Sequence, residues 1–90
     1  MQFMVIEHFN NGDAAAIYRR LEERGRQMPE GLDYVASWVS ADLGRCFQVM
    51  ACEDVTLLQR WVAAWCDLAR FEIVPVAESG AARCAMATQG

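Results

Sequence analysis

The stretch of residues 32–51, LDYVASWVSADLGRCFQVMA, decides the fold more than any other part of the chain. It divides into two segments rich in aromatic and β-branched residues, 32–41 and 45–51, which we predict to be strands. The three residues between them, Asp-Leu-Gly at 42–44, are typical of a tight hairpin connection. The centre of the chain is therefore predicted to be a β-hairpin.

A strand and a helix are predicted before this hairpin. Residues 2–9, QFMVIEHF, alternate and are rich in strand formers. Asp13 is the best candidate for a helix N-cap, and apolar residues then recur at helical spacing from residue 14 to about residue 27. Pro29 prevents the helix from continuing, because proline lacks a backbone N–H and clashes with the preceding turn.

A second helix and a fourth strand are predicted after the hairpin. Residues 55–67 carry an apolar stripe at helical spacing that includes Leu58, Trp61 and Trp65. Residues 70–77, RFEIVPVA, form the last predicted strand. Because Pro75 cannot donate a ladder hydrogen bond, we expect this strand at an edge of the sheet.

The resulting order βαββαβ predicts an α+β fold. With right-handed crossovers it gives a ferredoxin-like layer, a four-stranded antiparallel sheet in the order 4-1-3-2 with both helices on one face. We expect residues 1–77 to form this single domain. Residues 78–90 are mostly small residues and are predicted to be a flexible C-terminal tail.

The face of the sheet away from the helices is predicted to need a partner. A sheet face left in water usually carries polar side chains. Here both faces are apolar: in the second strand Tyr34 and Trp38 oppose Val35 and Val39, and the first and third strands behave likewise. Such a face exceeds the apolar area that monomers usually expose. We therefore predict a homodimer through the open sheet face, a dimeric α/β barrel.

Composition excludes several classes of partner. The chain has 90 residues, twelve acidic and eight basic, and a net charge of −4, which argues against nucleic-acid binding. No apolar run reaches the roughly 20 residues that a membrane-spanning helix needs. The start of the chain does not resemble a signal peptide, so we expect a cytoplasmic protein. Four arginines of the first helix could hold an anionic ligand or partner, but the interleaved Glu22 and Glu23 favour a solvated helix face: Arg19, Arg20, Arg24 and Arg26.

The cysteines do not predict a metal site. Their positions form no C-x-x-C pair, and the chain has a single histidine, so no zinc site or other metal site is expected. We interpret Cys46, Cys52 and Cys66 as small buried hydrophobic residues. Cys84 lies among small residues and is the thiol that we expect to be exposed.

Two groups of residues are candidates for a functional site. Glu7 and His8 are the candidates for catalysis; as neighbours in a strand they point to opposite faces and cannot act together within one subunit. A carboxylate such as Glu7 in apolar surroundings suits a general acid or base, and the alternative is an acid paired with an arginine such as Arg45. Four aromatic residues are candidates for a ligand pocket between sheet and helices, with core packing as the alternative: Tyr18, Trp38, Trp61 and Trp65.

Short motifs along residues 1–77 resemble a family of small, uncharacterised bacterial proteins, domain of unknown function 3303. These motifs are MVIE at 4–7, YRR at 18–20, PEGL at 29–32, RCFQVM at 45–50 and FEIVPV at 71–76. The resemblance implies a fold of the dimeric α/β-barrel type and brings no established activity.

Three functions are compatible with these observations. The first is a small homodimer that binds an apolar or aromatic molecule in its barrel. The second is a cofactor-independent monooxygenase or isomerase acting on a small aromatic or polyketide-like substrate, with Glu7 as base; this rests on analogy of fold. The third is a structural interaction protein without a ligand. No phosphate-binding loop or nucleophile elbow is present, and no cofactor is predicted.

Overall fold

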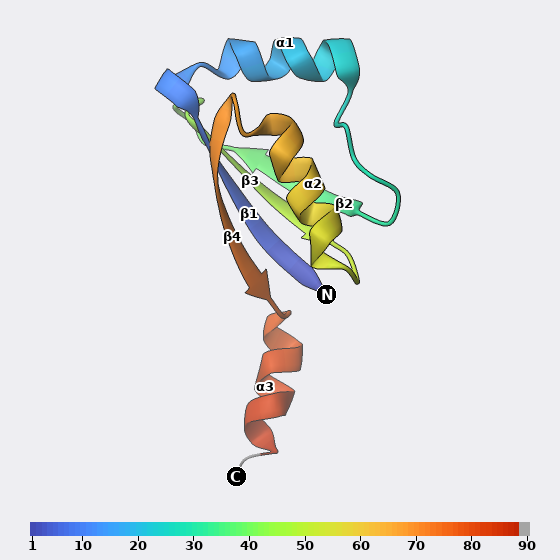
Figure 1. The fold of residues 1–90 in the computed structure, drawn as a ribbon. Helices are drawn as coiled ribbons and strands as arrows, with labels where there is room; N and C mark the ends of the chain where they lie inside the picture. Colours follow the sequence, from blue (N-terminus) through green and yellow to red (C-terminus); the bar gives the residue numbers. More distant parts are fainter. Residues whose placement is uncertain (89–90) are drawn as a thin grey trace.

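Strand β1 (Gln2–Phe9) lies inside a four-stranded antiparallel sheet, between β3 (Arg45–Ala51) and β4 (Ala69–Val76). Strand β2 (Asp33–Val39) pairs with β3, so the order is β2-β3-β1-β4. The computed structural model, which describes residues 1–88, thus confirms the predicted ferredoxin-like topology (Figure 1). Strand β4, which contains Pro75, is an edge strand as predicted.

The two helices of the fold begin at aspartate caps. In α1 (Ala14–Arg24) the Asp13 carboxylate accepts a hydrogen bond from the backbone N–H of Ala16. In α2 (Val55–Trp65) Asp54 accepts one from Thr56. Helix α1 ends three residues before the predicted boundary, because Gly25 adopts a φ of 67°, which stops the helical path.

Helix α2 lies over one face of the sheet, whereas α1 crosses the end of the sheet at which β1 finishes (Figure 1). Along β1 every second side chain is buried beneath the helices. Helix α2 buries Leu58, Trp61 and Trp65, but α1 buries only Ile17. As a consequence β2 is thinly covered and has no buried residue. The main core is made by β1, β3 and α2, and an opening is left beside β2.

A β-bulge changes which side chains of β2 share a face. Tyr34 pairs with Met50, but the register shifts before Ala36, and Trp38 then pairs with Phe47. Met50 is fully buried under the helices, whereas Phe47 belongs to the opposite face. The extra residue in the bulge therefore separates Tyr34 from Trp38, which we had predicted to lie on one face.

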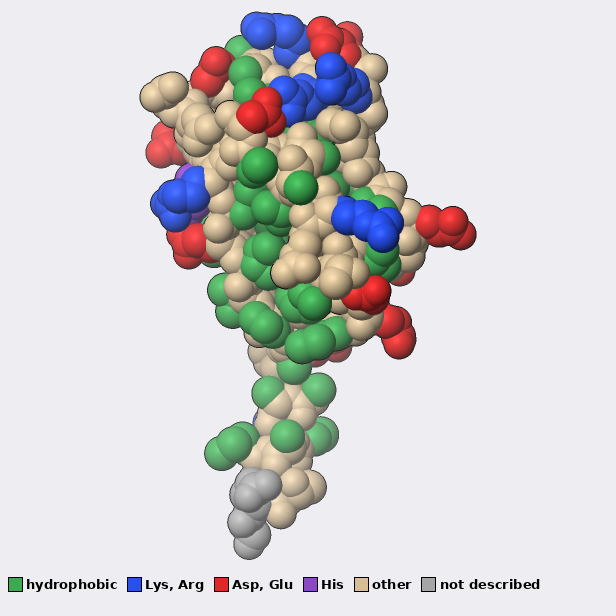
Figure 2. Space-filling model, viewed as in Figure 1, with side chains coloured by type: hydrophobic (Ala, Val, Ile, Leu, Met, Phe, Trp, Pro, Cys, Tyr) green, Lys and Arg blue, Asp and Glu red, His purple; other side chains and the backbone are tan. Residues whose placement is uncertain are grey.

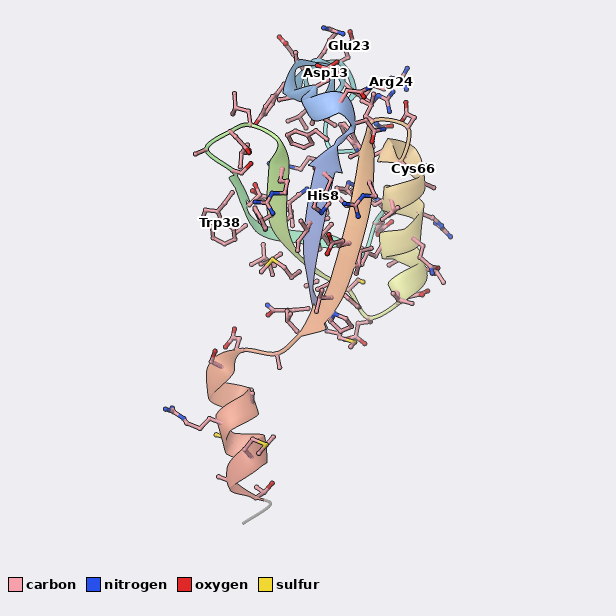
Figure 3. The ribbon with its side chains drawn as sticks, turned by 90° about the vertical axis from the view of Figure 1, so that its left-hand side faces the viewer. His8, Asp13, Glu23, Arg24, Trp38 and Cys66 are labelled. Carbon is pink, nitrogen blue, oxygen red and sulfur yellow. The ribbon has the colours of Figure 1, made fainter. Side chains whose placement is uncertain are left out.

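The sheet face away from α2 is apolar and uncovered. Trp38 is 58% exposed, and Val74 is 47% exposed. Figure 3 shows Trp38 projecting away from α2, on the other side of the sheet. Four further apolar side chains on this face are partly exposed: Met4, Ile6, Phe47 and Val49.

The C-terminal segment, predicted to be a flexible tail, contains a helix, α3 (Ser79–Ala87). This helix extends away from the sheet beyond β4 (Figure 1), and none of its residues is buried. Four of its nine residues are alanine, the residue with the highest helix propensity. Residues 89–90 of the predicted tail lie outside the described residues.

The cysteine predictions are correct at three positions and wrong at one. Cys46 and Cys52 are buried, and Cys84 is exposed. Cys66 is also exposed, because it follows the last residue of α2 and lies outside the buried stripe of that helix. Within residues 1–88, no helix is both long enough and apolar enough to span a membrane.

Candidate functional site

A cavity of about 140 Å³ lies between the sheet and both helices, at the opening beside β2. Side chains from β1, β2, β3, α1, α2 and the loop after α1 line it. Its apolar walls consist of Phe9, Ile17, Leu21, Met28, Trp61 and Trp65. An apolar cavity of about 150 Å³ accommodates benzene, so this cavity has room for about one ring.

Glu7 is the buried acid of the cavity. It lies on the helix-covered side of β1 and is only 6% exposed. Gln48, opposite on β3 and also buried, donates a hydrogen bond from Nε2 to Glu7 Oε1 at 2.5 Å. Burial raises the pKa of Glu7 to about 7, although the Gln48 hydrogen bond and the charge of Arg26 act to lower it. The acid is therefore close to half protonated at neutral pH.

Cys46 lies beside this acid on β3 and also lines the cavity. Burial, and then the charge of Glu7, raise the pKa of its thiol to about 11. The Cys46 thiol therefore stays protonated near neutral pH and is not an activated nucleophile.

The two tryptophans of α2 hold the loop that follows α1. Trp61 Nε1 and Trp65 Nε1 both donate to the backbone carbonyl of Arg26, at 3.0 and 3.1 Å. One carbonyl thus accepts both indole N–H groups, which satisfies two partly buried donors at once. The two indole rings pack in the hydrophobic core, and they also form part of the cavity wall.

Among the described residues that line the cavity, Arg26 is the only lysine or arginine. Its guanidinium lies over the ring of Tyr34, with Cζ 3.8 Å from the ring centroid. The Tyr34 hydroxyl is 2.6 Å from Ser37 Oγ, and Ser37 also lines the cavity. Arg26 was expected on a solvated helix face, but it lines the cavity, because α1 ends before it.

The other arginines of that group fit the sequence interpretation better. Figure 2 shows basic and acidic side chains interleaved over α1, at the top of the view. Arg20 differs, because its guanidinium forms a bidentate pair with Asp67, with contacts of 2.7 and 2.6 Å. It also donates to the carbonyl of Ala64, so it ties α1 to the end of α2.

The predicted site residues fall into two groups. Glu7, Tyr18, Trp61 and Trp65 line the cavity together. Trp38 does not, because the β2 bulge places it on the uncovered face (Figure 3). His8 also lies on that face, where Nε2 is 2.6 Å from Glu72 Oε1. Glu7 and His8 are thus on opposite sides of the sheet, as predicted from their adjacency.

Arg45 is not the partner of Glu7. It pairs with His8 in the sheet register, and its guanidinium lies 5.2 Å from the ring centroid of Phe47 on the uncovered face. The role of Gln48 was missed, although a polar residue at a buried position of β3 was the signal for it. Within residues 1–88, no group of three His, Cys, Asp or Glu side chains is arranged to hold a metal ion.

Fold and site together define the class of protein: a small ferredoxin-like α+β domain with an acid-containing cavity between sheet and helices. The chain belongs to the family described as Domain of unknown function (DUF3303), whose model matches residues 1–90. The match includes residues 78–90, which lay outside the resemblance seen in residues 1–77. No curated protein matches the sequence significantly.

The solved structures that are similar to this chain include the following two. Protein Atu4242 from Agrobacterium tumefaciens is 15% identical, with a TM-score of 0.53, covering 88% of this chain and 96% of that one. A structure titled antibiotic biosynthesis monooxygenase is 22% identical, with a TM-score of 0.49, covering 86% and 97% of the two chains. The first similarity supports the fold and nothing beyond it.

Proposed function

We propose that this protein binds a small, planar, largely apolar molecule whose polar group hydrogen-bonds to Glu7. The observation that carries the proposal is a buried carboxyl group that faces a ring-sized apolar cavity and has a neutral amide as its hydrogen-bond partner. A pocket with apolar walls and a few polar groups is the usual form of a small-molecule site. A ligand hydroxyl can donate to the Glu7 carboxylate.

Titration with phenol and toluene tests this proposal. The indole N–H resonances of Trp61 and Trp65 report on the cavity by NMR. We expect both compounds to shift them, with phenol binding more tightly in the wild-type protein. Glu7→Leu should remove the preference for phenol, whereas Glu72→Leu, on the uncovered face, should leave it unchanged. Absence of any shift with either compound would refute the proposal and favour a structural protein without a ligand.

A second candidate function is proton transfer by Glu7, as in a cofactor-independent monooxygenase or isomerase. The observation that favours it is the pKa of about 7, since a general base works best when its pKa is near the operating pH. In such a reaction Glu7 would remove a proton from carbon next to a carbonyl and leave an enolate. Cys46 and His8 have no part in this step.

Deuterium exchange separates catalysis from binding. Acetophenone, a planar one-ring ketone with acidic methyl C–H groups, is incubated with the protein in D₂O and followed by NMR. Catalysed exchange that disappears in Glu7→Gln while ketone binding persists supports the enzyme. Exchange at the uncatalysed rate, with binding retained, contradicts proton transfer and leaves the binding function.

We also propose that two copies associate through the uncovered sheet face. Trp38 and Val74 expose large apolar surfaces there, next to the partly exposed Ile6 and Phe47. A second copy would remove this apolar area from water, which is the main source of association energy. No part of the described residues covers the face.

Sedimentation equilibrium tests the association. We expect a mass of twice 10.1 kDa for the wild-type protein. Trp38→Glu should give monomers, and Val55→Glu, an equally drastic change at an exposed site on α2, should not. A monomeric wild-type protein would overturn the dimer.

The cysteines support a cytoplasmic location as part of the proposal. All four are free in the structure, and two of them are exposed. Exposed free thiols are usual in a reducing compartment and uncommon in secreted proteins. Cell fractionation with an antibody against the chain tests this assignment.

A further inference from the structure

The cavity has one permanently charged group at its mouth, the Arg26 guanidinium. Arg26 is exposed, whereas Glu7 is buried. These two are the only charged side chains in the lining formed by the described residues. Arginine stays protonated at any ordinary pH, while Glu7 is partly neutral near pH 7. The cavity therefore presents an excess of positive charge to a ligand.

Arg26 lies close enough to Glu7 for its charge to lower the pKa of that acid, but it makes no ion-pair contact within the described residues. Among residues 1–88, the three ion pairs within 4.0 Å involve His8, Arg20 and Arg70, and none includes Arg26. Stacking over Tyr34 occupies one face of the guanidinium and leaves its N–H groups, which lie in the guanidinium plane, directed to the sides. A planar fork of this kind matches the two oxygens of a carboxylate.

The group is also held in place before any ligand arrives. Two indole hydrogen bonds fix the Arg26 backbone from α2, and the Tyr34 ring beneath its side chain is held by the contact with Ser37. A charged group fixed in this way loses little conformational entropy on binding, which favours affinity. Core packing alone does not require an unpaired cation at this position.

We propose that the ligand of this cavity is a small aromatic carboxylate, with its ring between the apolar walls and its carboxylate on Arg26. The inference rests on the proposed binding function and specifies its ligand class. The ring would contact Trp61, Trp65 and Ile17, and the carboxylate would lie at the mouth, away from Glu7. A ligand hydroxyl on the far side of the ring would reach Glu7.

Calorimetric titration with benzoate and with benzyl alcohol, its neutral analogue, tests the inference. Wild-type protein should bind benzoate at least about tenfold more tightly, the usual effect of one good charge-assisted hydrogen bond. Arg26→Gln should bind the two compounds equally. Arg19→Gln is the matched control, because it makes the same change in net charge at a position outside the cavity. Thermal unfolding confirms that each variant is folded.

The outcomes separate this inference from the function on which it rests. Tighter binding of benzoate that is lost only in Arg26→Gln supports the carboxylate site. Equal binding of both compounds by the wild-type protein overturns it and leaves the proposed cavity function standing. An equal loss in Arg19→Gln also overturns it, because general electrostatic attraction would then explain the preference. Failure of both compounds to bind at millimolar concentration refutes the inference and the proposed function together.

Discussion

Gln48 on β3 donates its side-chain N–H to the carboxylate of Glu7 on β1, at 2.5 Å, inside the helix-covered face of the sheet. A buried acid is more commonly neutralised by a cation, but a neutral amide can only hydrogen-bond to it. This pairing leaves the cost of burying the charge largely uncompensated. The Glu7 carboxyl is therefore a source of pH dependence as well as a ligand contact.

Stability should fall as the pH rises between about 4.5 and 7. The pKa of Glu7 is about 7 in the folded protein, against an ordinary value of 4.5. Folding thus favours the protonated form of Glu7. The contribution of this acid to the stability of the folded protein is fully present below pH 4.5 and is lost as the pH rises through about 7. The loss amounts to about 3 kcal/mol across this range.

Urea denaturation at a series of pH values measures this effect. In Glu7→Gln the free energy of unfolding should fall less with rising pH, because an amide does not titrate. Above pH 7 this variant should be more stable than the wild-type protein. Glu30→Gln, at an exposed position outside the three ion pairs found among residues 1–88, is the control and should keep the wild-type profile. Identical profiles for wild type and Glu7→Gln would show that Glu7 has an ordinary pKa.

The shared acceptor on Arg26 predicts that Trp61 and Trp65 are energetically coupled. Replacing either by phenylalanine leaves the carbonyl with one donor, whereas replacing both leaves it with none. A buried polar group without a partner costs about 1–3 kcal/mol. The loss of stability in the double variant should therefore exceed the sum of the single losses by about 1 kcal/mol. Purely additive losses in urea denaturation would contradict the shared role.

Much of the fold could be predicted from the sequence because its signals are local. The alternation in residues 2–9 and the stripe of α2 each reflect burial on one side of an element, and Asp13 and Asp54 are standard caps. The bulge near Val35 gave no such signal. A bulge depends on how two strands align. This one places Trp38 on the uncovered face of the sheet, opposite the face on which the pocket was predicted.

The site was only partly predictable for a similar reason. Glu7 stands out as an acid within an apolar strand, and the two tryptophans stand out at helical spacing. Arg26 does not, because its position depends on where α1 ends and on the loop that follows, where Gln27 has a φ of 57°. Contacts between loops and distant elements leave no periodic pattern in a sequence.

The bidentate pair of Arg20 with Asp67 predicts that lysine cannot replace this arginine. Lysine keeps the charge but has no planar fork, so it cannot reach both carboxylate oxygens and the carbonyl of Ala64 together. Arg20→Lys should lower the midpoint of thermal unfolding. Arg19→Lys, at the neighbouring exposed position, should not. Equal midpoints for the two variants would indicate that the pair adds nothing to stability.

The four thiols should divide into two reactive and two protected groups. Cys66 and Cys84 are exposed, whereas Cys46 and Cys52 are buried, and the thiol of Cys46 has a pKa of about 11. Disulfide exchange needs both access and a thiolate, so an aromatic disulfide reagent should label two thiols rapidly in the folded protein and four in denaturant. The double variant Cys66→Ser with Cys84→Ser should show no rapid labelling. Rapid reaction of Cys46 would mean that the cavity opens widely in solution, because the folded arrangement keeps that thiol buried and protonated.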